Sequence, residues 1–226
     1  QVTQNFNEGC PTDPYAQAFV GITTGEGIDA TTYSADAFEI TNTGTIAIES
    51  VSVDLSTAFF PDIHWDPTGA AGDATAVCLT PFGSSAADTG YVTPGNPCVD
   101  PFTDDADSPG GYHVATMAFT DFTAGETFAF TADVDPYSIT GFDAAGNAGA
   151  ISGLEASGAT ISIDFADGSS AIVETTFGDS PGGSSTIVPN DNPTVGLDVQ
   201  GVTLNPTGYS NGATAAYVTT ASQVAE

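Results

Sequence analysis

The sequence predicts an all-β protein, an antiparallel β-sandwich of the immunoglobulin-like or jelly-roll type. Apolar and polar residues alternate with a period of two over most of the chain, which is typical of half-buried strands. The alternating runs are short, rich in Thr, Val, Ile and Phe, and recur at roughly ten-residue spacing between turn signals. No segment of about 12 residues combines a 3.6-residue period with a helix-forming composition.

The expected strands follow these runs in chain order. Apolar residues alternate at Phe38 and Ile40, and again over residues 46–48 and 51–55. The parity changes between Ile48 and Val51, which predicts a β-bulge near Glu49 and Ser50. Further runs lie at residues 117–119, 128–130, 161–165, 197–199 and 202–204. The turn sequences between runs are Asn-Thr-Gly at 42–44, Thr-Ala-Gly at 123–125, Ala-Asp-Gly at 166–168 and Asn-Pro-Thr-Gly at 205–208.

Residues 10–226 are expected to form a single β-sandwich domain. Residues 1–9 are short, polar and β-compatible, so they predict either a first strand or an N-terminal arm that subunits exchange. Residues 212–226 are β-compatible as well, and they carry no charge before Glu226. Flat strands without edge lysines are poorly protected against pairing with other chains.

The three cysteines predict one disulfide. Cys78 and Cys98 flank a stretch rich in Gly, Pro and Ser, which indicates a long loop closed by a bond between them. Closing a loop of this size contributes on the order of 3 kcal/mol in chain-entropy estimates. Cys10 is then either a buried free thiol or bonded to another chain. A zinc site with His64 or His113 is an alternative, but the close Cys-x-x-Cys pairing is missing.

The chain has no Lys or Arg, 29 Asp or Glu residues and a formal net charge of −29. Without basic side chains it cannot neutralise phosphates, so we expect no nucleic-acid partner, and no apolar run is long enough for membrane insertion. Charged residues make up 13% of the chain, against about 25% in typical domains, so bases are missing while acids are not in excess. This favours a secreted, protease-resistant protein over one adapted to high salt, although both remain open.

Two acidic clusters predict calcium as the bound cation, because carboxylate oxygens are its preferred ligands. Asp104, Asp105 and Asp107 precede a Gly-Gly pair, although the EF-hand spacing is missing. Asp133 and Asp135 alternate at the end of a strand, and Asp143 follows. The alternatives are a solvated acidic loop at the first cluster and a simple strand cap at Asp135 and Pro136.

Aromatic residues beside acidic loops suggest a carbohydrate site. Trp65 lies between Asp62 and Asp73, and Tyr112 follows the first acidic cluster, so both are candidates for stacking on a sugar. The alternative is that Trp65, the only tryptophan, belongs to the core. No Gly-x-Ser-x-Gly motif supports a Ser–His–Asp site, and the remaining carboxylates fit strand and turn positions. The sequence therefore does not predict an enzyme.

Five segments together resemble a domain of large secreted microbial surface proteins, which often also carry malectin-like modules. They read Ala-Phe-Glu-Ile-Thr-Asn-Thr-Gly (37–44), Trp-Asp-Pro-Thr-Gly-Ala-Ala-Gly-Asp (65–73), Phe-Thr-Asp-Phe-Thr-Ala-Gly-Glu-Thr-Phe-Ala-Phe (119–130), Asp-Val-Asp-Pro (133–136) and Ile-Ser-Gly-Leu-Glu (151–155). The resemblance covers about residues 35–175 and implies an extracellular β-sandwich without a transferred catalytic residue.

The function expected from these observations is structural. A protein without protease-sensitive basic residues, with β-compatible ends, suits a subunit of an extracellular fibre or cell-surface layer. Such subunits would form a homopolymer by β-strand addition, with external cations offsetting their charge. The alternative is a calcium-dependent module that binds carbohydrate or mediates adhesion.

Overall fold

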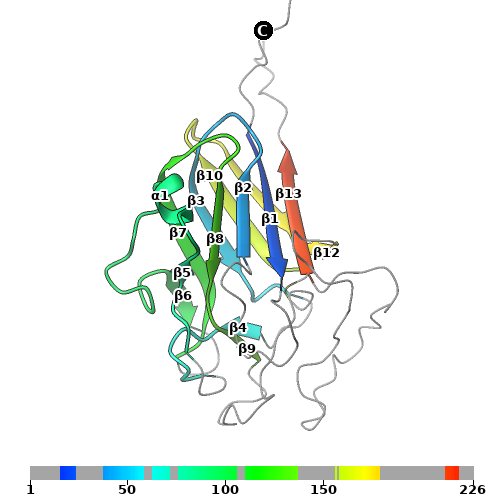
Figure 1. Ribbon diagram of the computed structural model, residues 1–226. Coiled ribbons are helices and arrows are strands. Elements are labelled where there is room, and N and C mark those ends of the chain that lie inside the picture. Colours follow the sequence, from blue (N-terminus) through cyan, green and yellow to red (C-terminus); the bar gives the residue numbers. More distant parts are fainter. Residues whose placement is uncertain are drawn as a thin grey trace, which may run out of the picture.

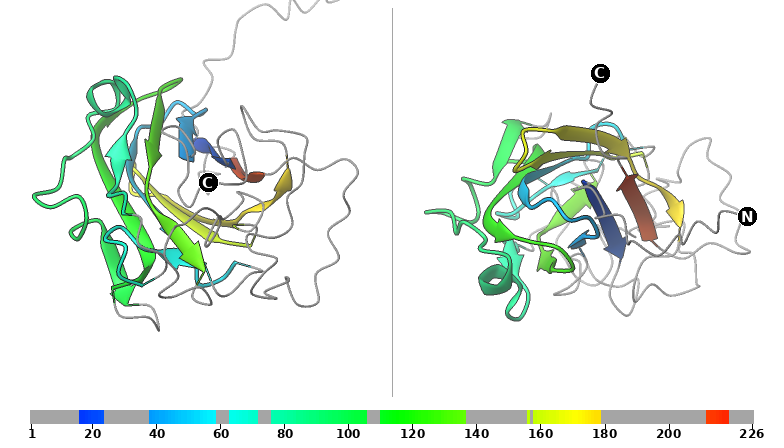
Figure 2. Two further views of the ribbon diagram at one scale, coloured as in Figure 1. Left: turned by 60° about the horizontal axis from the view of Figure 1, so that its bottom comes forward. Right: turned by 90° about the horizontal axis from the view of Figure 1, so that it is seen from above.

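The protein is described from a computed structural model, which covers residues 16–23, 38–58, 63–71, 76–105, 110–136, 156, 158–178 and 212–218. Two antiparallel sheets pack face to face, which confirms the predicted β-sandwich (Figures 1 and 2). The predicted arm at residues 1–9, Cys10 and the strands expected at 197–199 and 202–204 lie outside the described residues. Among the described residues, no helix is long and apolar enough to cross a membrane.

The first sheet has six strands, and its order differs from the order along the chain. Its strands from edge to edge are β12 (Thr176–Gly178), β13 (Gly212–Val218), β1 (Gln17–Thr23), β2 (Phe38–Asn42), β8 (Thr127–Thr131) and β5 (Thr80–Pro81). All pairings are antiparallel. The last described strand, β13, therefore lies inside the sheet beside the first, β1 (Figure 1).

The second sheet has seven strands. Six follow the order β11 (Ser170–Glu174), β10 (Thr160–Phe165), β3 (Ile48–Asp54), β7 (Tyr112–Phe122), β4 (Ile63–Trp65) and β9 (Val134–Pro136), and β6 (Phe102–Asp105) pairs with β7. The register of β3 against β7 shifts between Ile48 and Ser50. This shift confirms the irregularity predicted from the change of parity.

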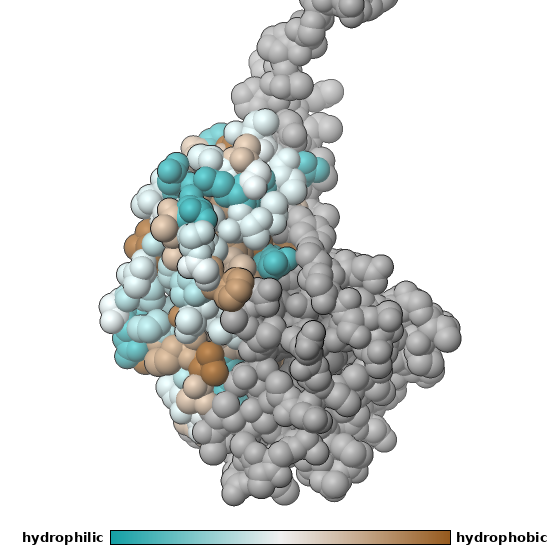
Figure 3. Space-filling model, viewed as in Figure 1, coloured by the Kyte–Doolittle hydropathy of each residue, from teal (hydrophilic) through white to brown (hydrophobic). Residues whose placement is uncertain are grey.

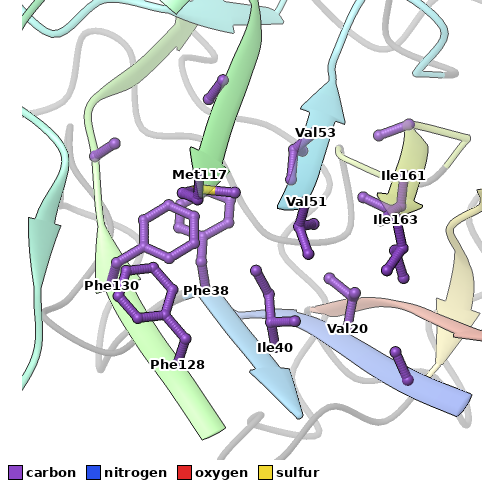
Figure 4. Close-up of a cluster of buried hydrophobic side chains, with 14 of the residues drawn as sticks. Val20, Phe38, Ile40, Val51, Val53, Met117, Phe128, Phe130, Ile161 and Ile163 are labelled. Carbon is purple, nitrogen blue, oxygen red and sulfur yellow. The ribbon is translucent and has the colours of Figure 1, made fainter. Parts of the chain in front are cut away.

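The core lies between the two sheets. Val20 and Ile40 from the first sheet face Val51, Met117 and Ile163 from the second, and all five are buried (Figure 4). Stacked rings extend this core, with centroids 4.9 Å apart for Phe38 and Phe130. Alternating burial along β2 and β10 matches the period-two pattern of the sequence, because successive strand residues point to opposite faces.

The described turns at residues 42–44, 123–125 and 166–168 lie where the sequence predicts them, and the turn predicted at 205–208 lies outside the described residues. Asn42 is fully buried, and its side-chain amide donates to the carbonyls of Ile46 and Phe122, each at 2.9 Å. Its Oδ1 accepts the amide of Gly44, so one side chain fixes the connection from β2 to β3. Gly168 adopts a φ of 81° in the turn between β10 and β11, which explains why glycine follows Asp167.

Burial along β8 departs from alternation, since Phe128, Ala129, Phe130 and Thr131 are all buried. A short helix, α1 (Ser85–Asp88), packs against this strand. The Ser85 hydroxyl donates to the Ala129 carbonyl at 2.9 Å. The sequence pattern did not predict α1, because one turn of helix is too short to show a period.

The predicted disulfide between Cys78 and Cys98 is confirmed, with the two Cα atoms 4.4 Å apart. The closed loop has defined structure of its own, since it contains β5 and α1, and its Tyr91 forms a bridge with Phe119 of β7.

Over the described part of the face in Figure 3, most residues are hydrophilic or near neutral and few are strongly hydrophobic.

Candidate functional site

A buried polar cluster lies where β4 meets β9. His64 and Asp135 are directly opposite each other in the pairing of these strands, and both are fully buried. Opposite residues share one face of a sheet, so the strands bring an imidazole and a carboxylate together. Asp133, also fully buried, precedes β9 and donates its backbone amide to the Val77 carbonyl. Because residues 64 and 135 are far apart in the chain, no local pattern in the sequence indicates this pairing.

The carboxylate of Asp66 organises the turn beside this cluster. Its two oxygens accept the backbone amides of Ala70 at 2.9 Å and Ala71 at 2.8 Å. Its own amide donates to the Asp133 carbonyl at 3.1 Å. Asp66 therefore has a structural role, because its carboxylate holds the turn that follows Trp65.

Gly111 closes the cluster on the side of the first acidic loop. A Cβ at this position would lie 3.0 Å from His64 Nε2 and closer still to His64 Cδ2, so a side chain would displace the imidazole. Gly111 is itself buried. Gly111, the second glycine after the aspartates, therefore allows close packing against His64, which the sequence alone did not indicate.

The described members of the two predicted calcium clusters lie in or beside β6 and β9, which belong to the same sheet but are separated in it by β7 and β4. Asp105 pairs with Tyr112, Tyr112 with Trp65, and Trp65 with Val134, which Asp133 and Asp135 flank. Asp105 and Val134 are thus three strand spacings apart, or roughly 14 Å. The clusters share one end of the sheet, but their strands hold the two backbones apart.

Asp104 takes part in a different contact. It has a φ of 61°, uncommon for a residue with a side chain. Its carboxylate lies 3.5 Å from Nδ1 of His113, with 66% of the Asp104 side chain and 21% of the His113 side chain exposed. Asp107 and Asp143 lie outside the described residues. Within the described ranges, no group of three His, Cys, Asp or Glu residues is arranged to hold a metal.

The prediction that Trp65 forms a sugar platform is wrong, because its ring is fully buried in the core. Its centroid lies 5.1 Å from that of Phe38 and 6.0 Å from that of Phe102. Tyr112, the second candidate, is half-buried and stacks on Phe102 at 5.7 Å. The alternative assignment of Trp65 to the core is the correct one.

Burial also changes the chemistry of one phenol in the closed loop. Desolvation raises the pKa of Tyr91 from 10.0 to about 12. Its ring packs on Phe128 at a centroid distance of 4.7 Å. The Tyr91 phenol therefore stays neutral to a higher pH than an exposed tyrosine does.

Residues 78–105 cover the outer edges of both sheets on one side of the sandwich. The amide of Phe82 donates to the Ala129 carbonyl of β8 at 2.8 Å. On β7, the carbonyl of Ala118 accepts the amide of Val92 at 2.9 Å, and the amide of Thr116 donates to the Pro101 carbonyl at 2.8 Å. The disulfide thus closes a segment that occupies hydrogen-bonding groups of two different sheets.

On the opposite side of the sandwich, the outer strands of the two sheets are β11 and β12. The chain leaves β11 in one sheet and enters β12 in the other through Thr175. The Thr175 amide donates to the Ala159 carbonyl at 2.9 Å, and its hydroxyl donates to the Ala156 carbonyl. On β11, Ile172 is 73% exposed, more than any other large hydrophobic residue among those described. β11 therefore presents the side chain of Ile172 to solvent, between the exposed residues Ser170 and Glu174.

These features define a β-sandwich module in which the disulfide loop lies along one side, while on the other side β11 pairs with β10 alone among the described residues. Comparison of the chain with protein-family models, curated proteins and solved structures finds no match.

Proposed function

We propose that the chain is a structural subunit of an extracellular fibre or cell-surface layer. Copies join by β-strand addition, and external cations offset their charge. The observation that supports this most is the contrast between β11 and the other outer strands. An outer strand exposes unpaired backbone groups, so its length and composition decide whether another chain can pair with it.

Most outer strands carry features that hinder pairing. β5 has two residues and includes Pro81, and β9 has three and includes Pro136. Proline lacks the amide hydrogen that a ladder needs. β6 contains Asp104 with its positive φ, which interrupts a regular ladder. These strands are poor sites for adding a neighbour.

β11 lacks such protection. Its sequence, Ser-Ala-Ile-Val-Glu, contains neither Pro nor Gly, and Glu174 is its only charged residue. Within the described residues it pairs with β10 alone. Edge lysines, a common defence against aggregation, are absent from the entire chain. An outer strand of this kind, with Ile172 exposed and neither Pro nor Gly in its sequence, supports a role in self-association.

The net charge requires a partner of opposite sign. Packing subunits of charge −29 raises mutual repulsion, and the chain has no Lys or Arg to relieve it. Calcium is the cation we expect, since carboxylate oxygens abound. The expected sites remain the two aspartate clusters, with Asp133 and Asp135 the members that are fully buried.

Two observations support an extracellular location. Disulfides such as Cys78–Cys98 persist mainly in oxidising environments. The absence of Lys and Arg removes every trypsin-type cleavage site. Both properties suit a material exposed outside the cell.

Assembly is tested by electron microscopy and sedimentation of purified protein in calcium, in chelator, and in sodium chloride of equal ionic strength. We expect filaments or sheets in calcium and at least a tenfold loss of sedimenting material in chelator. Ile172→Lys should reduce assembly, because it adds a charge to β11. Val92→Lys is the matched control, since Val92 is 50% exposed on the covered side. Monomers under every condition would defeat the proposal.

The carbohydrate-binding alternative now depends on Tyr112. The burial of Trp65 removes one of its two aromatic candidates, while Tyr112 remains half-buried beside Asp105 of the neighbouring strand. Calcium-dependent glycan binding that is lost in Tyr112→Ala and kept in Tyr112→Phe would favour this alternative over the structural role.

A further inference from the structure

β13, the last described strand, is an inner strand of its sheet. β13 pairs with β12 on one side and with β1 on the other. Its pairing with β1 runs from Gln17 opposite Val218 to Thr23 opposite Gly212 and covers both strands completely. Its pairing with β12 covers only Thr176–Gly178. β13 therefore completes the sheet mainly through its ladder with β1.

The sheet depends on this strand. If β13 left its place, the whole of β1 would lose one ladder and β12 would lose its only described partner. The vacated place would expose the inward residues Ala18 and Val20, which are now buried. A subunit without its own β13 therefore needs an equivalent strand, and the same strand of a second copy provides identical hydrogen bonds.

The connection to β13 is long enough for such an exchange. Antiparallel neighbours are commonly joined by loops of about 2–5 residues. Here residues 179–211 lie between β12 and β13. A chain of this length spans on the order of 100 Å when extended, several times the ~17 Å radius of gyration expected of a domain this size. The covalent connection therefore does not confine β13 to its own subunit.

We propose that β13 is the strand that subunits exchange, and that the place between β1 and β12 of a neighbouring copy receives it. This rests on the proposed assembly function, and it specifies the donor strand and its acceptor. The isolated subunit occupies the place with its own β13, and the assembled subunit occupies it with the β13 of its neighbour. Because both states form the same ladder, exchange costs little beyond the ordering of the connection.

Disulfide trapping distinguishes the two states. Gly21 and Thr214 are opposite each other in the β1–β13 register, and opposite Cα atoms about 5 Å apart fall within disulfide range. The double variant Gly21→Cys/Thr214→Cys is made in a Cys10→Ser background, assembled in calcium and oxidised. Exchange predicts a ladder of covalent oligomers on a denaturing, non-reducing gel. Retention of β13 predicts cross-linked monomers.

A matched control uses a pair that does not involve β13. Gly21 is also opposite Glu39 of β2, so Gly21→Cys/Glu39→Cys should give only monomers whether or not β13 exchanges. Mixing the single variants Gly21→Cys and Thr214→Cys before assembly adds a second control. Exchange predicts covalent dimers containing one copy of each variant, and these are absent if β13 stays in its own subunit.

The outcomes separate this inference from the proposed function. Assembled material that contains only monomeric cross-links would overturn the exchange of β13 and leave assembly through another strand such as β11. A failure to assemble in any cation would instead remove the proposed function. If the cysteine variants do not fold, Ala215→Pro added to wild-type protein replaces them, since Ala215 pairs with Val20. Exchange predicts at least twofold shorter filaments, and unchanged lengths would contradict it.

Discussion

His64 and Asp135 are opposite each other across β4 and β9, and neither side chain is accessible to solvent. The arrangement is notable in a chain with no Lys or Arg, because histidine is the only side chain that can carry a positive charge near the buried carboxylates. Buried carboxylates are costly unless they are hydrogen-bonded, protonated or neutralised. Removing the imidazole should therefore destabilise the protein, and the cluster should respond to cations.

Replacing His64 tests the contribution of the cluster. His64→Ala should lower the free energy of unfolding by about 2–4 kcal/mol, because it removes buried contacts beside two carboxylates. His113→Ala is the control, since its contact with the largely exposed Asp104 should contribute less than about 1 kcal/mol. Denaturant unfolding measures both values. Equal effects of the two substitutions would contradict a special role for the buried imidazole.

Calcium should raise the temperature of unfolding relative to sodium chloride of equal ionic strength. A ligand that binds only the folded state at about 100 times its Kd adds roughly 2.7 kcal/mol. Asp135→Asn should remove most of this increase if the second aspartate cluster holds the ion, whereas Asp121→Asn, at an exposed position on β7, should retain it. An increase that persists in Asp135→Asn would place the calcium elsewhere.

Gly90 should be intolerant of any side chain. Its φ is 63°, and a Cβ there would lie 2.5 Å from Thr120 Oγ1 and 2.8 Å from the Asp121 amide nitrogen. Gly90→Ala should therefore destabilise the protein by about 2–4 kcal/mol, from backbone strain and displacement of β7. Gly168 has a φ of 81° but open space around it, so Gly168→Ala should cost only about 1 kcal/mol. Similar losses would show that the close approach to β7 does not matter.

Tyr91 should make the protein sensitive to alkaline pH. Burial raises its pKa from 10.0 to about 12, so folding favours the neutral phenol. This contribution is fully present below the unfolded pKa and is lost as the pH rises through the folded pKa. Tyr91→Phe should therefore lose less stability than wild type between pH 10 and 12. Thermal unfolding across this range, with tyrosinate absorbance followed in parallel, checks the difference.

Local patterns in the sequence predicted much of the fold. Alternation identified β2, β10 and the centre of β7, and the change of parity after Ile48 located the register shift in β3. Gly168 followed a turn signal because its left-handed backbone favours glycine. The spacing and loop composition of Cys78 and Cys98 indicated their bond. Each of these features depends on residues close in sequence or on a strong local preference.

Contacts between segments that are distant in the sequence could not be predicted from local patterns. Trp65 is surrounded by acidic and turn residues in the sequence, and only its packing on Phe38 and Phe102 shows that it belongs to the core. The pairing of His64 with Asp135 and the place of β13 beside β1 depend on sheet topology, which alternation does not encode. The sequence thus predicted the positions of the strands better than it predicted which strands lie side by side.

The disulfide loop also bears on how the sandwich resists mechanical load. Residues 78–105 bond to β8 in one sheet and to β7 in the other, so pulling the sheets apart on that side breaks backbone hydrogen bonds on both. On the far side, β11 and β12 are joined covalently through Thr175, while β13 is held in its sheet by ladders on each edge. The β13 ladders consist of hydrogen bonds alone, whereas the sheets are also joined covalently on both sides, so tension should release β13 before it separates the two sheets, and the Cys78–Cys98 loop should stay intact until late in unfolding.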